Sequence, residues 1–278
     1  MSAAETSPSR WTLFRSDMAV LRSLVFKRND GRDHQGRLES FYSGQAEHYD
    51  GFRERMLHGR RELMQSIVWP KDGIWLDLGC GTARNLEYAG PGARDLSQIH
   101  FVDLSPSLLS QAQRRLAATR EAWQANDSGA NASIGKDGSV AANSGTPTLE
   151  THLHDVTALP WADASVDLVS FSYSLTMIPD WFAAIREARR VLRPGGKIAV
   201  VDFFVSRKHP DAGDVRHRGI TRAFWSHWFA CDNVFLSPDH LPMLRREFEG
   251  ERVEQARGKI PYLPLVRAPF YQFVGTKA

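Results

Sequence analysis

The stretch Leu76-Asp77-Leu78-Gly79-Cys80-Gly81-Thr82-Ala83 decides the fold that this sequence predicts. It has the pattern of a buried strand that ends in an acidic residue, followed by a glycine turn that opens a helix. Glycines let the backbone pass close to a ligand, and the free amides of a helix N-terminus attract an anionic group. Arg84 stands where a nicotinamide-binding motif has its third glycine, so a nicotinamide oxidoreductase is disfavoured.

Short apolar runs recur along the chain around this stretch. They cover residues 74–78, 99–103, 166–171 and 197–202. Helical segments lie between them: one begins at Ala83, one at Ser105-Pro106, and one spans residues 181–192 before Pro194-Gly195-Gly196. This alternation predicts an α/β fold with a Rossmann-like, doubly wound and mostly parallel sheet. Two late runs, 252–255 and 270–274, resemble antiparallel strands that complete a seven-stranded sheet.

The chain divides into an N-terminal helical cap, residues 1–68, and a ligand-binding domain, residues 69–278. In the cap, residues 11–28 form a basic amphipathic helix that either packs on its own domain or lies on an anionic membrane surface. Residues 124–147 contain too few large aliphatic side chains to bury, which predicts a flexible insertion. Residues 203–240 are basic and aromatic, as expected of a substrate region or of a solvated loop over a buried helix.

Two further acidic residues follow predicted strands. Asp103 closes the second strand about twenty residues after the glycine turn, where a carboxylate can accept both ribose hydroxyls of an adenosine. Asp155 follows the third strand, where a carboxylate can take the exocyclic amine of adenine. An Asp at a strand end is more often only a cap, but three in register indicate a nucleoside site.

These motifs resemble the class I S-adenosylmethionine-dependent methyltransferases over residues 73–202. The likeness also includes Phe171-Ser172-Tyr173 and Val191-Leu192-Arg193-Pro194-Gly195-Gly196, and it departs at Ala83, where many relatives have a third glycine. The resemblance implies S-adenosylmethionine as the cofactor. The cofactor-binding residues that it implies are Arg60, Asp77, Gly79, Gly81, Asp103, Leu104, Asp155, Val156 and Ser172.

Over nearly the whole chain the sequence also resembles a narrower family, the betaine-lipid methyltransferases. It rests on Phe41-Tyr42-Ser43-Gly44-Gln45-Ala46, Leu57-His58-Gly59-Arg60, Thr221-Arg222-Ala223-Phe224-Trp225, Ser237-Pro238-Asp239-His240-Leu241-Pro242 and similar segments. This likeness implies trimethylation of the amino group of diacylglyceryl-homoserine. It also implies a lipid amine substrate, an anionic membrane surface, and association with the separate enzyme that attaches the homoserine.

Candidate catalytic and substrate residues follow from the chemistry of methylating an amine. Aromatic faces stabilise methylated ammonium groups, so Tyr42, Tyr49 and Tyr173 are candidates, although core packing explains each tyrosine equally well. Cationic side chains that can hold the homoserine carboxylate lie in the basic aromatic region. They are Arg207, Arg216, Arg218 and Arg222, and their alternative role is a solvated basic loop.

Composition excludes several other classes of protein. The formal net charge of the 278 residues is only +3, so no nucleic-acid partner is expected. Cys80 and Cys231 support neither a disulfide framework nor a metal site, and no signal peptide or membrane span is evident. We therefore expect a cytoplasmic protein bound peripherally to the inner face of the membrane. The alternatives are methylation of phosphatidylethanolamine or another small amine, and a non-catalytic membrane-surface adaptor with the same fold.

Overall fold

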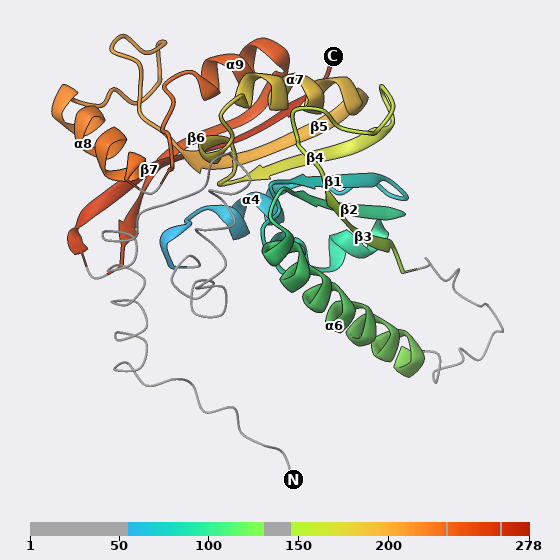
Figure 1. The fold of residues 1–278 in the computed structure, drawn as a ribbon. Helices are drawn as coiled ribbons and strands as arrows, with labels where there is room; N and C mark the ends of the chain where they lie inside the picture. The colour runs from blue at the N-terminus through green and yellow to red at the C-terminus, as the bar shows by residue number, and fades with distance from the viewer. Residues whose placement is uncertain (1–54, 131–145, 232, 262) are drawn as a thin grey trace.

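A seven-stranded mixed sheet forms the centre of the molecule within residues 55–130, 146–231, 233–261 and 263–278, which the computed structural model describes (Figure 1). The strand order is β3-β2-β1-β4-β5-β7-β6. Neighbours from β3 to β5 run parallel, whereas β7 is antiparallel to both β5 and β6. The predicted Rossmann-like, mostly parallel sheet is confirmed. The strands are β1 Ile74–Leu78, β2 Gln98–Asp103, β3 Thr148–Leu153, β4 Val166–Ser172, β5 Leu192–Phe203, β6 Glu249–Ile260 and β7 Leu263–Thr276.

Helices cover both faces of this sheet. The described α-helices are α4 Arg60–Ser66, α5 Asn85–Ala89, α6 Pro106–Ala130, α7 Trp181–Val191, α8 Gly219–Ala230 and α9 His240–Glu247, and two short 3-10 helices are η1 Gly90–Asp95 and η2 Leu175–Met177. Side chains of α4, α5, α6 and α8 share one hydrophobic core with one face of the sheet. Side chains of α7 and α9 share a second core with the opposite face. The sheet is therefore doubly wound, as its alternating pattern predicts.

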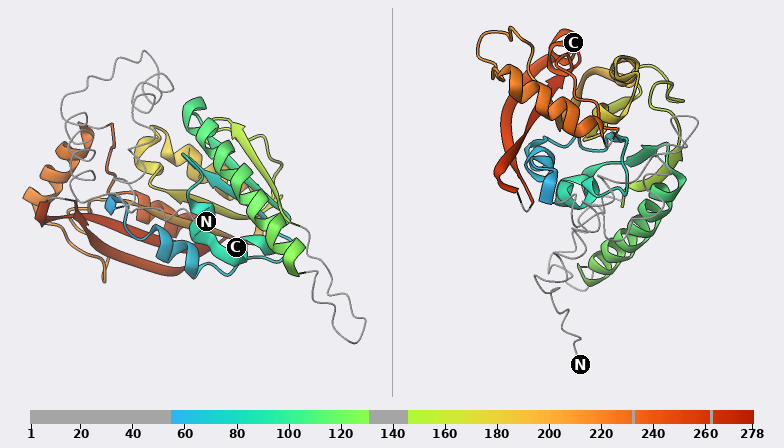
Figure 2. Two further views of the ribbon diagram at one scale, coloured as in Figure 1. Left: turned by 90° about the horizontal axis from the view of Figure 1, so that it is seen from below. Right: turned by 60° about the vertical axis from the view of Figure 1, so that its left-hand side comes forward.

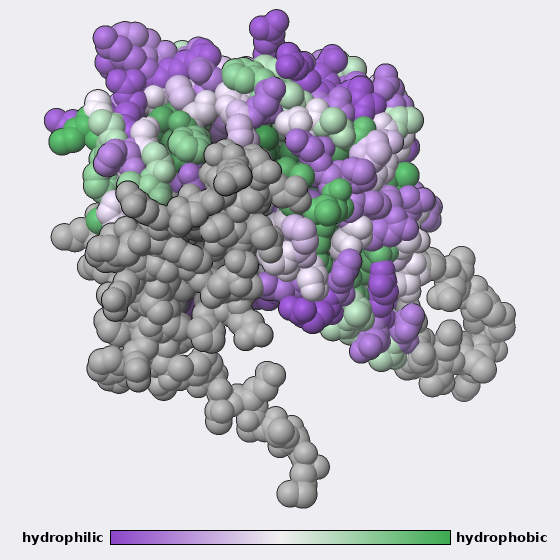
Figure 3. All heavy atoms as spheres, viewed as in Figure 1, coloured by the Kyte–Doolittle hydropathy of each residue, from purple (hydrophilic) through white to green (hydrophobic). Residues whose placement is uncertain are grey.

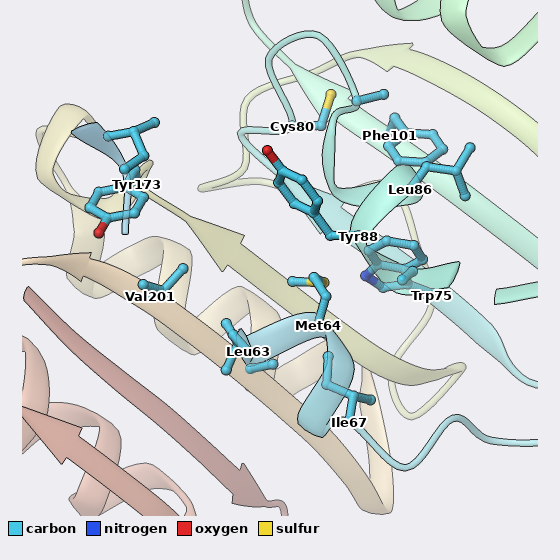
Figure 4. Packing of buried hydrophobic residues seen from close by; sticks show 14 of the residues in the cluster. Leu63, Met64, Ile67, Trp75, Cys80, Leu86, Tyr88, Phe101, Tyr173 and Val201 are labelled. Carbon is cyan, nitrogen blue, oxygen red and sulfur yellow. The ribbon is translucent and has the colours of Figure 1, made fainter. Parts of the chain in front are cut away.

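The central strands are buried on both faces because they read as almost continuous apolar runs. In β1, Trp75 packs into the first core, whereas Leu76 and Leu78 pack into the second. Figure 4 shows Leu63 and Met64 of α4 facing the strands that carry Trp75 and Val201. This packing places the carboxyl ends of the parallel strands, and the turns that follow them, beside α4 and α5.

The structure corrects two predicted boundaries. Residues 124–130, which we predicted to begin the flexible insertion, continue helix α6, which extends away from the sheet (Figures 1 and 2). An exposed helix end needs no apolar face, so the lack of large aliphatic side chains does not stop it. The helix predicted to start at Ala83 begins instead at Asn85, because Ala83 has a left-handed backbone with φ of 58°.

Several predicted features lie wholly or partly outside the described residues. They are the amphipathic helix at 11–28, Tyr42, Tyr49, and residues 131–145 of the insertion. Of the predicted cap, the structure describes residues 55–68 with helix α4. No helix in the described ranges has both the length and the apolar character needed to cross a bilayer.

Candidate active site

The turn between β1 and α5 has the conformation that its glycines allow. Gly79, Gly81 and Ala83 all have left-handed φ angles, of 65°, 59° and 58°. A Cβ atom at Gly79 would approach the Cβ of Ser174 to 2.4 Å, so only glycine fits there, whereas a Cβ at Gly81 would meet no atom within 4 Å. The turn therefore packs tightly on its inner side and leaves space on its outer side, where a ligand can approach the backbone.

Asp103 connects this turn to the end of β2. One carboxylate oxygen accepts a hydrogen bond from the backbone N–H of Gly81 at 2.8 Å, and the other accepts one from Ser105 at 2.9 Å. Both oxygens of the carboxylate are therefore oriented by backbone amides. The predicted partner of the ribose thus lies directly against the glycine turn.

A buried network lies beside the turn and links four elements. The carboxylate of Asp77 accepts hydrogen bonds from Ser170 Oγ at 2.6 Å and from Asn85 Nδ2 at 2.9 Å. Arg60 donates to Asn85 Oδ1 and to Ser172 Oγ, both at 3.0 Å. The structure thereby brings together Arg60, Asp77 and Ser172, three of the predicted cofactor residues, from α4, β1 and the end of β4.

Opposing effects act on the pKa of the Asp77 carboxyl group. Burial raises the pKa of its carboxyl group to about 6, while the hydrogen bonds from Ser170 and Asn85 and the positive charge of Arg60 act in the opposite direction. Asn85 and Ser170 were missed by the sequence analysis. Ser170 could have been found, because it precedes Ser172 by two positions on β4 and so lies on the same face of that strand.

Tyr88 of α5 is a further residue that the sequence analysis missed. Its ring is buried, and three guanidinium groups lie near its centroid: Arg61 at 4.6 Å, Arg60 at 5.4 Å and Arg84 at 5.9 Å. Contacts of this kind are cation–π interactions. The side of the site next to α4 and α5 is therefore rich in positive charge, which suits the carboxylate of an amino acid moiety.

The turn after β3 carries the two residues predicted to meet adenine. Asp155 is exposed, and one of its oxygens accepts hydrogen bonds from the backbone N–H and the hydroxyl of Thr157, at 2.8 and 2.7 Å. Val156 is buried, and Leu104 after β2 is half-buried. An apolar residue after each of two neighbouring strands is the arrangement expected around a flat base.

Tyr173 follows β4 and is buried. Its hydroxyl donates to the carbonyl oxygen of His58 at 2.6 Å, and its ring packs against Phe203 with centroids 4.5 Å apart. Burial, with a contribution from the negative charge of Asp202, raises the pKa of this phenol well above its ordinary value. Tyr173 can therefore contribute its aromatic ring, while its hydroxyl positions the segment that leads into α4.

The four predicted substrate arginines lie in three different environments. Arg207 is paired with Asp239, with Nε and one Nη each 2.7 Å from the same carboxylate oxygen. Arg216 and Arg218 are exposed in the loop before α8. The Nε of Arg222 in α8 is buried and has no hydrogen-bond partner among the residues that the structure describes. These arginines do not form one cluster around a single anion.

Comparisons with known proteins agree with this geometry. Residues 76–200 match a family model described as "Methyltransferase domain". The "Ubiquinone/menaquinone biosynthesis C-methyltransferase UbiE" of Paracoccus denitrificans is 31% identical over 184 residues, which are 62% of this chain and 61% of that protein. The "Demethylmenaquinone methyltransferase" of Desulfitobacterium hafniense is 25% identical over 182 residues, again 61% of its length. This chain thus matches less than two thirds of the length of these relatives.

Solved structures share the fold. A geranyl diphosphate C-methyltransferase of Streptomyces coelicolor, crystallised with S-adenosyl-L-homocysteine, has a TM-score of 0.54 at 12% identity, covering 91% of this chain and 89% of its own. A phosphoethanolamine N-methyltransferase of Haemonchus contortus has a TM-score of 0.53 at 15% identity, covering 78% of this chain and 52% of its own. At such identities the likeness establishes the fold alone.

The fold and the matched family model define a class I methyltransferase domain in this chain. Its cofactor is S-adenosylmethionine, and the residues present fit that group: an open glycine turn, Asp103 at the end of β2, and a cationic wall around Tyr88. Residues 76–200 thus match a methyltransferase domain, and the chain shares its fold with solved methyltransferases.

Proposed function

We propose that this chain is an N-methyltransferase that trimethylates the amino group of diacylglyceryl-homoserine, forming diacylglyceryl-trimethylhomoserine. The observation that carries the proposal is the surface of α8, where Ile220, Phe224 and Trp228 are 77%, 44% and 37% exposed. Figure 3 shows hydrophobic side chains among hydrophilic ones at the corner that α8 occupies in Figure 1. Apolar side chains next to the exposed Arg216 and Arg218 suit a substrate held in an anionic membrane.

Arg222 is the best candidate to hold the carboxylate of the homoserine group. A buried N–H without an acceptor costs about 1–3 kcal/mol, and a bound carboxylate would remove that cost. Burial is the main cause that lowers the pKa of His217 to about 4. The positive charges of Arg257 and Arg222 lower this pKa further. Arg207 is less suited to this role because Asp239 already occupies its guanidinium group.

The residues of this chain would bind and orient the reactants. When bound, S-adenosylmethionine supplies a methyl group that a neutral amine accepts by in-line displacement. The glycine turn and Asp103 fix the donor side, and Arg222 fixes the lipid headgroup. Tyr42, Tyr49 and the ring of Tyr173 would surround the methylated ammonium group, whose permanent charge aromatic faces tolerate.

The proposal includes peripheral attachment to the cytoplasmic, anionic face of the membrane and association with the enzyme that attaches homoserine. The exposed apolar residues of α8 and the basic helix predicted at residues 11–28 are the segments that would carry this attachment. Both would bind through a combination of apolar insertion and charge, so the attachment should weaken in high salt.

Methylation of a quinone ring carbon is the second candidate function. The observation that favours it is the similarity to relatives whose names give C-methylation in quinone biosynthesis, one of which is 31% identical over 184 residues. A quinone substrate is also apolar and membrane-borne, so α8 would suit it as well. Unlike the homoserine lipid, however, it offers no carboxylate to the buried Nε of Arg222.

The deciding experiment supplies the full chain and S-adenosylmethionine with anionic vesicles that contain one candidate acceptor at a time. The acceptors are diacylglyceryl-homoserine, phosphatidylethanolamine and a demethylated quinol, and mass spectrometry of the extracted lipids detects the products. We expect mono-, di- and trimethyl homoserine lipid only. Methylation of the quinol or of phosphatidylethanolamine alone would overturn the proposal, and donor binding without any product would favour the adaptor.

A pair of arginine variants makes this test more specific. Arg222→Gln should slow methylation of the homoserine lipid at least tenfold more than Arg207→Gln, because losing a charge-assisted carboxylate contact costs about 1.5–3 kcal/mol. Equal rates in the two variants would show that the carboxylate is held elsewhere.

A further inference from the structure

Three metal-ligating side chains meet on the face of the sheet that carries α7 and α9, near the edge strand β3. His100 comes from β2, and Glu150 and His152 come from β3, on adjacent parallel strands in which His100 is paired with Glu150 and Val102 with His152. Val102 belongs to the core shared with α7 and α9, and His100 lies two positions away on the same face of β2. The cluster is separate from the turn and the network that make up the donor site.

The candidate ligand atoms of these three residues lie 3.0–3.5 Å from one another. His100 Nδ1 lies 3.0 Å from His152 Nε2 and 3.4 Å from Glu150 Oε2, and His152 Nε2 lies 3.5 Å from the same Glu150 oxygen. In a tetrahedral zinc site, bonds of about 2.0–2.1 Å to nitrogen and oxygen place neighbouring ligand atoms about 3.3–3.4 Å apart. The three atoms are therefore spaced like one face of a zinc tetrahedron.

Neighbouring residues hold the two imidazoles in orientations that suit a metal. His100 Nε2 lies 3.0 Å from Gln98 Oε1, so a proton on Nε2 can be donated to the amide oxygen while Nδ1 keeps its lone pair. Metal-bound histidines usually make such a contact with their other nitrogen. Trp161 packs edge-on against both rings, with centroid distances of 5.4 Å to His100 and 5.0 Å to His152.

Access for an ion is available from one side. His100 is buried, while the side chains of His152 and Glu150 are 24% and 49% exposed. A cation can thus enter from solvent beside Glu150, and a water molecule can complete the coordination. Two neutral imidazoles with one carboxylate make up a ligand set that zinc commonly has in proteins.

The geometry points to a zinc-binding site formed by His100, Glu150 and His152, which ties the edge strand β3 to β2. No residue of this set takes part in the proposed methyl transfer, so the site goes beyond that activity. Its position gives it a structural role: within the described sheet β3 is the edge strand paired with β2, and it leads directly into the turn at Asp155 and Val156. An ion that bridges the two strands would hold this turn in place.

The test measures Zn²⁺ binding to the full chain, freed of metal with a chelator and then titrated in competition with a chromophoric chelator. We expect one tight site per chain. Glu150→Gln, which changes an exposed side chain, and His152→Ala should each weaken binding about a hundredfold or more, because the loss even of a residue that only hydrogen-bonds a metal ligand usually costs about 10- to 100-fold. His209→Ala removes an exposed imidazole outside the cluster and should leave the affinity unchanged.

Thermal unfolding provides a second readout that does not depend on activity. Zn²⁺ in excess should raise the unfolding temperature of the wild-type chain and of His209→Ala, and raise that of Glu150→Gln clearly less, since a ligand that binds only the folded state stabilises it in proportion to its affinity. Wild-type Zn²⁺ affinity in Glu150→Gln and His152→Ala, or the same thermal shift in all variants, would overturn the proposal. The three side chains would then be a hydrogen-bonded cluster without a metal.

Discussion

Replacing Ala83 by glycine tests the unusual backbone of the cofactor turn. Ala83 is fully buried and has φ of 58°, a left-handed conformation that costs a residue with a Cβ atom about 1–2 kcal/mol. Glycine removes that cost. It also loses a buried methyl group, worth about 0.8 kcal/mol, and gives the unfolded chain more freedom, worth about 0.4–1 kcal/mol. These contributions nearly cancel, so we expect the free energy of unfolding to change by less than ~1 kcal/mol.

Ala112→Gly is the matched control for this substitution. Ala112 is equally buried and belongs to the same hydrophobic core, but it lies inside helix α6. There the substitution removes the same methyl group and costs about 1 kcal/mol in helix propensity, and it relieves no backbone strain. We expect a loss of ~2 kcal/mol, which for a chain of this size lowers the melting temperature by roughly 4–8 °C.

Urea unfolding and thermal unfolding of the two variants provide the comparison. The reasoning requires Ala83→Gly to be more stable than Ala112→Gly by at least ~1 kcal/mol. Equal losses in both variants would refute it, because Ala83 would then not have a strained left-handed backbone. Ala83→Gly should also keep its affinity for S-adenosylmethionine, since the amides of the turn retain their positions.

Four other changes test the donor site, a buried histidine and the N-terminal segment. Asp103→Ala should weaken binding of S-adenosylmethionine by ~1.5–3 kcal/mol in calorimetry, and unchanged affinity in the folded variant would contradict the ribose contact. Arg60→Gln should weaken donor binding, whereas Arg186→Gln, an exposed arginine of α7 on the opposite face of the sheet, should not; equal effects on the measured affinity would remove Arg60 from the site. Burial lowers the pKa of His240 to about 3, so its native state takes up a proton less readily than the unfolded chain. Stability relative to His240→Leu should therefore fall by ~1–2 kcal/mol as pH drops from about 6.5 to 5 in urea unfolding, and a pH-independent difference would exclude this linkage. Deleting residues 1–28 should reduce sedimentation with anionic liposomes, and unchanged binding would assign the attachment to another surface.

The proximity of the glycine turn and Asp103 could be predicted from the sequence because the determinants of both are local. The glycine turn directly follows β1, and Asp103 is the last residue of β2, so a strand pattern and a spacing are enough to place both. Parallel strands end at the same edge of the sheet, which brings the two residues together without further information. The contact between Asp103 and the amide of Gly81 is the result.

The rest of the donor site depends on contacts between distant segments. Asn85 becomes a site residue because its amide bridges Asp77 and Arg60, and Arg60 reaches it from a different helix. The cluster of His100, Glu150 and His152 near β3 depends on such contacts as well. His100 and His152 meet because β2 and β3 are neighbouring strands, although the two residues are far apart in the sequence.

The boundary of α6 shows a different limit of sequence patterns. Hydrophobic periodicity predicts the part of a helix that packs on a core, and the buried residues of α6 lie between Leu108 and Leu116, with Trp123 packed against the core further along. From residue 124 on, the helix continues on its backbone hydrogen bonds. A composition poor in aliphatic side chains therefore excludes burial but does not exclude helix.

The segment that leads into α4 connects the N-terminal part of the chain to the donor site. The carbonyl oxygen of His58 accepts from Tyr173, that of Gly59 accepts from Gln272 of β7, and Arg60 donates to Asn85 and Ser172. Gly59 has φ of 80°, and a Cβ atom there would approach Gln272 Nε2 to 2.6 Å, so the close approach needs glycine. Three consecutive residues are thus held by β4, α5 and β7 at the edge of the sheet where the donor binds. A change in the position of Arg60 on donor binding would therefore also act on His58 and Gly59, whose carbonyl oxygens accept from Tyr173 and Gln272.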